Sequence, residues 1–169
     1  MKATEVLADG FGRIREEVHA VLEGLDAETL AARPDPGANS VAWLVWHLAR
    51  IQDVQVAGPA GRTEVWHEEG WAGRFGLDLP AGSDGYGHTP EEAGKVLVED
   101  GALLRDYYDA VHARSLEYLH GLTAADLGRV VDERWDPPVT LGVRLVSILA
   151  DDLQHVGQAA YLRGLLERR

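Results

Sequence analysis

The sequence contains no cysteine, which excludes disulfides, cysteine-ligated zinc and a cysteine nucleophile of the protein's own. A chain without cysteine is compatible with a reducing compartment. If the chemistry of this protein uses a thiol, that thiol must come from another molecule.

Long apolar runs are also missing. No stretch of about 20 apolar residues is present, so no segment is predicted to span a membrane. The N-terminal stretch has acidic side chains early and no apolar signal core, which argues against secretion. We therefore expect a cytoplasmic protein that does not bind membranes.

Positive charge is scarce. The chain has 16 Lys and Arg against 28 Asp and Glu, a net charge of −12, and its only lysines are Lys2 and Lys95. No basic run interrupts this balance. Because an acidic surface repels phosphate backbones, we expect no nucleic-acid partner.

The composition is otherwise that of a globular protein. Hydrophobic residues make up 46% of the 169 residues and charged residues 26%. This length suits one domain with a substantial core, and no linker divides the chain. We predict a single domain over residues 1–169.

Apolar residues at helical spacing predict four long helices. Three of them have clear N-terminal caps: Asn39 or Ser40, Thr89 in a capping box with Glu92, and Thr140. The predicted helices cover residues 2–25, about 40–57, 89 to about 120, and 140 to about 167. We also predict a helical turn at 123–128 and a connector at 130–140 that is extended in its first half.

Residues 58–88 differ from the rest of the chain, because they are rich in glycine and hold Trp66, Trp71, Phe75 and Tyr86. So long a connection in a compact domain is usually functional, and its aromatic residues predict that it is packed. A short helix near 63–73 is expected within it. The connection is long enough for the second and third helices to run parallel, and the whole pattern predicts an all-α four-helix bundle.

The last helix carries an unusual polar group on its core side. On a helical wheel, Asp151 and His155 lie together at one side of the apolar arc, and their i, i+4 spacing lets both reach one point. Arg144 and Gln158 share this edge. Asp152 lies nearer the middle of the arc and is a competing candidate. Burying such groups is costly unless they are paired.

The second helix offers a third group. His47, within "VAWLVWHLAR", lies on the core side of its helix. A bundle that places this helix against the last one can bring His47 to Asp151 and His155. Two imidazoles and one carboxylate form a metal site with open positions, as in catalytic sites.

Metal-free interpretations remain open. A lone histidine on an apolar face is more often a core residue with a satisfied hydrogen bond. Asp152 could form a buried ion pair with Arg144 or Arg163, which would account for the acids without a metal. His67, in the 58–88 connection, could serve as an acid/base group or be a surface or packing residue.

Two motifs, "NSVAWLVWHLAR" (39–50) and "GVRLVSILADDLQHVGQAAYLRG" (142–164), carry a family resemblance. The sequence resembles the DinB-like superfamily of four-helix metal-binding proteins, which includes the YfiT-like proteins and the mycothiol-dependent maleylpyruvate isomerase. The helix layout fits over nearly the whole chain. The resemblance implies an up-down-down-up bundle and a homodimer.

The resemblance also implies a ligand set. In the family, a histidine of the second helix and an H-x-x-x-H pair on the last helix bind a divalent metal. His47 matches the first position and His155 the last, while Asp151 stands where the other histidine is common. Members resembling the maleylpyruvate isomerase have a carboxylate there. We expect Zn²⁺ or Ni²⁺ on His47, Asp151 and His155.

Several relatives bind a low-molecular-weight thiol, such as mycothiol, whose thiolate attacks an electrophile. The resemblance therefore implies a metal-dependent thiol S-transferase or related detoxification enzyme, in which the metal activates a thiolate or water. Arg144 and Gln158 would orient an anionic substrate or the ligand carboxylate. The isomerase itself has an additional C-terminal domain that this sequence lacks, so isomerase activity is not expected. The alternative is a non-catalytic metal-binding stress protein with a structural or vestigial site.

Overall fold

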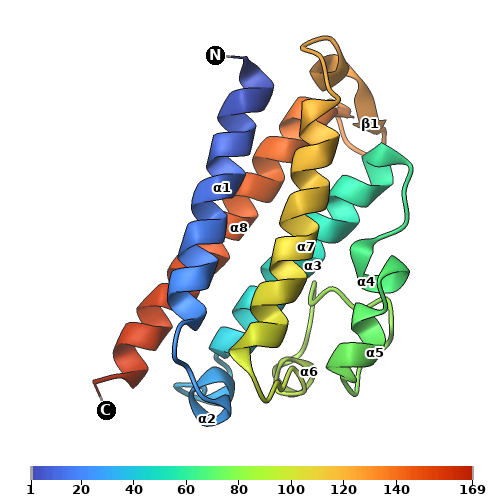
Figure 1. The fold of residues 1–169 in the computed structure, drawn as a ribbon. Helices are drawn as coiled ribbons and strands as arrows, with labels where there is room; N and C mark the ends of the chain where they lie inside the picture. The colour runs from blue at the N-terminus through green and yellow to red at the C-terminus, as the bar shows by residue number, and fades with distance from the viewer. Residues whose placement is uncertain (1, 169) are drawn as a thin grey trace.

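The computed structural model describes residues 2–168 (Figure 1). The four long helices are α1 (Ala3–Leu22), α3 (Val41–Ala60), α7 (Gly101–His120) and α8 (Leu141–Leu166). The shorter helices are α2 (Ala27–Ala31), α4 (Val65–Glu68), α5 (Trp71–Phe75), α6 (Pro90–Ala93) and the 3₁₀ helix η1 (Asp126–Gly128). The strands β1 (Val130–Asp132) and β2 (Val139–Thr140) pair antiparallel ahead of α8.

The long helices form a bundle in which α1 and α3 each pack against both α7 and α8. Figure 1 shows that α1 and α8 run in one direction and α3 and α7 in the other. The predicted all-α, up-down-down-up bundle is therefore confirmed. Because the connection between α3 and α7 is long, the chain can return along the bundle before α7 begins, and the two helices are parallel.

α3 is the most deeply buried helix. It packs against α7 and α8 and also contacts α2 and α4, and all of its residues from Val41 to Asp53 are buried. Its polar side chains consequently need partners inside the protein. Gln52, for example, donates to the Ser115 hydroxyl of α7 at 2.8 Å. Despite this burial, none of the helices described in residues 2–168 is long and apolar enough to cross a membrane.

The prediction of one helix from 89 to about 120 is wrong. Thr89 does form the capping box with Glu92, but the helix that it begins, α6, ends at Ala93. The chain then turns at 94–95 and continues without regular secondary structure, with Val96 and Val98 buried and Leu97 exposed between them. A second cap, Asp100, accepts from the Ala102 amide and begins α7.

Smaller elements agree better with expectation. Ser40 and Thr140 cap α3 and α8, the turn near 123–128 contains η1, and the extended half of the connector is β1. The single short helix expected near 63–73 is two helices, α4 and α5. Gly70 separates them in a left-handed conformation, with φ of 73°.

A buried polar network fastens the 58–88 connection to the bundle. Arg50 is fully buried and donates to the Glu64 carboxylate at 2.8 Å and the Ser83 carbonyl at 3.1 Å. Asp53, one turn along α3, accepts from the Val65 and Trp66 amides at 2.9 and 2.8 Å, so it holds the start of α4. Arg50 Nη1 and Asp53 Oδ2 lie 3.5 Å apart and form a buried ion pair. The connection is thus packed, as predicted.

Replacing Asp53 tests this network. Asp53→Ala removes two amide contacts and the hydrogen bond from the Tyr107 hydroxyl, and it leaves Arg50 buried with less compensation. We expect a loss of about 3–5 kcal/mol in the free energy of unfolding, measured by urea denaturation.

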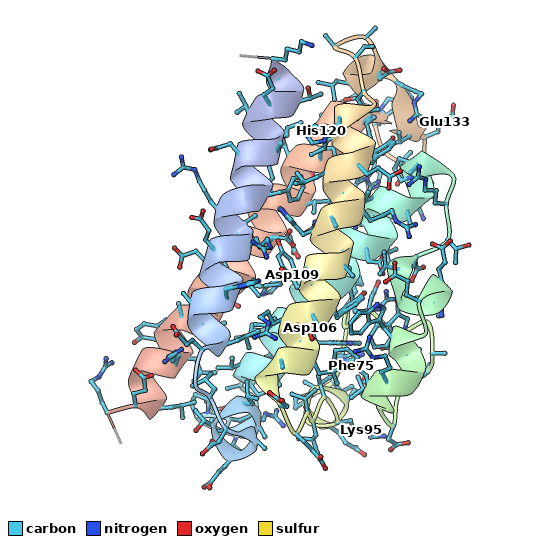
Figure 2. The ribbon with its side chains drawn as sticks, viewed as in Figure 1. Phe75, Lys95, Asp106, Asp109, His120 and Glu133 are labelled. Atoms are coloured by element: carbon cyan, nitrogen blue, oxygen red, sulfur yellow. The ribbon has the colours of Figure 1, made fainter. Side chains whose placement is uncertain are left out.

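Asp106→Ala is the matched control, since Asp106 (Figure 2) is half-exposed on α7 and its side chain bonds, in the described part of the chain, only to its neighbour Arg105. That variant should change the free energy of unfolding by no more than about 0.5 kcal/mol. Equal small losses in both variants would contradict the role assigned to Asp53.

Candidate metal centre

Three side chains from two facing helices converge at the α3–α8 interface. His47 comes from α3, and Asp151 and His155 come from α8. Each offers one ligand atom, and these atoms lie within 4.8 Å of one another. Among residues 2–168 it is the only such group of three. The convergence follows from antiparallel packing of α3 and α8, which brings the first half of α3 against the middle part of α8.

His47 is oriented by the 58–88 connection. Its Nδ1 donates to the Asp84 carbonyl at 2.6 Å, which leaves the Nε2 lone pair available as a ligand. Trp43, one turn earlier, stacks on the imidazole at 4.5 Å between ring centroids. Burial lowers the pKa of His47, which favours the neutral form that binds metals.

Gly85 makes this contact possible. Its backbone has φ of 91°, and a Cβ at this position would lie 2.5 Å from His47 Nδ1. A side chain would therefore push the loop away from the imidazole. Glycine is required here for two reasons, backbone conformation and close approach.

His155 is oriented within α8. Its Nδ1 lies 3.1 Å from Gln158 Oε1, and its Nε2 lies 3.6 Å from Asp151 Oδ1. Gln158, at i+3, thus accepts from one ring nitrogen and turns the other toward the cluster. The neighbouring Asp151 carboxylate raises the pKa of His155.

Asp151 shows that the residues present fit a cation. Its Oδ2 is buried and has no hydrogen-bond partner among residues 2–168. A buried carboxylate oxygen without a partner is costly, and a divalent ion would satisfy it. Two imidazoles and one carboxylate suit first-row divalent metals. The side chains of Asp151 and His155 are 36% and 18% exposed, so the cluster is accessible to small molecules.

The metal-free explanation for Asp152 is wrong. Asp152 is fully buried, and neither carboxylate oxygen has a hydrogen-bond partner among residues 2–168. Its proposed partners are engaged elsewhere: Arg144 bonds to Asp132, and Arg163 bonds to Glu167. Burial raises the pKa of Asp152 well above its usual range, so it is a neutral core group.

Other residues singled out from the sequence lie outside the cluster. Arg144 lies two turns before Asp151 on α8, and its hydrogen bonds go to Gln55 and Asp132. His67 lies on α4 and pairs with Glu64 at 3.6 Å. Of the two expected helpers, only Gln158 touches a ligand.

One functional position was missed. His88 accepts from the Trp43 indole at 3.2 Å and bonds to the Ser83 hydroxyl at 2.7 Å, so it fixes the ring that stacks on His47. In the sequence His88 merely precedes a helix cap. The glycine-rich stretch around it was the available signal of close backbone approach.

This fold and this cluster define a class: small all-α bundles with a candidate 2-His-1-carboxylate metal site between two of their helices. The family follows from sequence comparison. The DinB superfamily model matches residues 11–159, and the chain belongs to this superfamily, which is metal-binding in general.

Solved structures agree with this assignment. A conserved protein from Enterococcus faecalis is 37% identical with a TM-score of 0.94, and the match covers 100% of this chain and 99% of that one. A DinB-like protein from Bacillus cereus is 17% identical with a TM-score of 0.68, covering 96% and 92%, and shows the fold alone. No curated protein matches.

A pair of glycine variants tests how the loop orients His47. Gly85→Ala forces a Cβ against the imidazole, whereas Gly87→Ala, with φ of 73°, meets no atom within 4 Å. Both variants share the cost of a left-handed alanine, so only the clash differs. We expect Gly85→Ala to weaken Zn²⁺ affinity by about tenfold or more and Gly87→Ala to leave it nearly unchanged, measured by competition with a chromogenic chelator. Equal affinities would show that the loop does not position His47.

Proposed function

We propose that this protein is a divalent-metal-dependent enzyme, a thiol S-transferase or related detoxification enzyme, with Zn²⁺ or Ni²⁺ held by His47, Asp151 and His155. The observation that carries the proposal is the unpartnered Asp151 oxygen within a solvent-accessible cluster of two oriented imidazoles. Three protein ligands leave coordination positions for a substrate, which is the arrangement of catalytic sites.

The protein's own groups supply orientation and shielding. The Asp84 carbonyl and Gln158 hold the two imidazoles by their Nδ1 atoms, so each Nε2 faces the cluster. Trp43 covers the inner side of the His47 ring and keeps water from it. When bound, the ion supplies Lewis-acid stabilisation of a thiolate or hydroxide at neutral pH.

The nucleophile is borrowed, since the chain has no cysteine. We propose that a small cytoplasmic thiol such as mycothiol enters from the exposed side of α8, where Asp151 and His155 lie, and attacks a small electrophile. The exposure of these two side chains supports access from that side, since His47 is only 5% exposed.

A homodimer would form through a different face of α8, away from Asp151 and His155. The exposed positions of α8 carry no charge, although the chain as a whole has a net charge of −12. Two acidic copies repel each other least where their charges are absent. The apolar members of this uncharged face are Val143, Val146, Ala150, Leu153, Gly157, Ala160 and Tyr161.

Removing one ligand tests the metal assignment. His155→Ala should lower metal affinity by about 100-fold or more, with loss of metal-dependent conjugation of thiols to 1-chloro-2,4-dinitrobenzene. Metal content is measured on protein purified without chelator, and Gln154→Ala, an exposed neighbour, is the control.

Stoichiometric metal in His155→Ala would overturn the ligand set. Metal that raises only the melting temperature of the unaltered protein, with no turnover across a panel of thiols and electrophiles, would favour the non-catalytic alternative instead.

A charge on the uncharged face tests the dimer. Leu153→Glu should convert a dimer to a monomer in light scattering, because a buried carboxylate at the interface would lack a partner. Val6→Glu on α1 is the control, since both side chains are 54% exposed. A monomeric unaltered protein, or dissociation by both substitutions, contradicts an interface on α8.

A further inference from the structure

A polar hollow lies along the α3–α8 interface, which also holds the candidate metal ligands His47, Asp151 and His155, called the metal cluster below. It has a volume of about 630 Å³ and opens between the end of α3, the β1 segment and the start of α8. Its polar lining consists of Gln55 on α3, Arg129, Asp132 and Arg134 around β1, and Arg144 on α8. We call this hollow the arginine cavity.

The charge of the arginine cavity is opposite to that of the chain. Three arginines and one aspartate line it, whereas acidic residues outnumber basic ones 28 to 16 in the whole sequence. Glu133, between two lining residues, is not part of the lining and projects from the outer edge of the bundle (Figure 2). The cavity is therefore a local positive site on an acidic protein.

Asp132 shows how the cavity holds a carboxylate. Arg134 donates to its two oxygens from Nε and Nη2 at 2.9 and 2.8 Å, and Arg144 donates to Oδ2 at 2.9 Å. Such two-pronged contacts are the strong form of carboxylate recognition. These arginines hold the pKa of Asp132 well below its usual range.

One carboxylate does not balance this lining. Among residues 2–168, the hydrogen bonds of Arg129 go to neutral groups, the Pro59 carbonyl and the Tyr118 hydroxyl. Asp132 neutralises the charge of one of the three guanidinium groups, so the lining of the cavity keeps a net positive charge. An external anion would neutralise this remaining charge.

The arginine cavity and the metal cluster share the α3–α8 interface. Gln55 lies two turns after His47 on α3, and Arg144 lies two turns before Asp151 on the antiparallel α8. At 1.5 Å of rise per residue, both helices place the two sites about 10–12 Å apart. This spacing matches the length of a small extended molecule.

We infer that the arginine cavity binds the carboxylate or phosphate group of a small anionic substrate whose reactive end lies at the metal cluster. The assignment of the reactive end rests on the proposed function, whereas anion binding stands on the cavity itself. The inference gives the proposed enzyme a substrate class: a thiol or electrophile with an anionic group about 10 Å from its reacting atom.

Calorimetric titration of metal-free protein with succinate and with inorganic phosphate tests the inference. Arg134→Gln and Arg144→Gln should each weaken binding of the preferred anion by about tenfold or more, and Asp132→Asn, which removes the competing internal carboxylate, should tighten it. Arg134 is 85% exposed at its side chain and, within residues 2–168, bonds only to Asp132, so its replacement should leave the fold intact.

Arg13→Gln is the charge control, because Arg13 lies exposed on α1 and bonds to Asp9. It should bind the anion as the unaltered protein does. The inference is overturned if neither succinate nor phosphate binds the protein, or if Arg13→Gln weakens anion binding as much as Arg134→Gln does.

The two anions show which chemical group the cavity prefers. His155→Ala should bind that anion with unchanged affinity in the same titration. The titration therefore tests anion binding independently of whether His155 is a metal ligand.

Discussion

The buried ion pair of Arg50 and Asp53 is the constraint on which the candidate site depends. A fully buried guanidinium is tolerated only with compensating acceptors, and two of those acceptors, Glu64 and the Ser83 carbonyl, belong to the 58–88 connection. Asp53 holds the start of α4 in the same way. The network clamps both ends of the connection to α3. It thereby brings the next carbonyl, that of Asp84, to His47.

The two neighbouring acids of α8 show how strongly one residue of helical rotation changes chemistry. A step of about 100° turns Asp151 toward α3 and solvent and Asp152 into the bundle interior. Asp151 stays accessible beside two imidazoles, whereas burial raises the pKa of Asp152 well above its usual range. The first can serve as a ligand. The second is a neutral polar group in the core.

α8 presents three different surfaces to three environments. One face packs into the bundle, one edge forms the interface with α3 that holds the metal cluster and the arginine cavity, and the remaining face is exposed and uncharged. The proposed chemistry, anion recognition and self-association would therefore use different faces of a single helix. α3 is buried and supplies the opposite wall of the interface.

Sequence by itself determined the bundle, most helix starts and the three residues of the cluster, because apolar periodicity, caps and i, i+4 spacing are local properties. It did not determine where the helix begun at Thr89 ends, since the irregular segment with buried Val96 and Val98 depends on the surface that it covers. Only the tertiary structure decided the Asp84 carbonyl contact, the close approach of Gly85 and the arginine cavity. These are contacts between segments far apart in the chain, and a backbone carbonyl or a shared cavity leaves no periodic pattern in the residues.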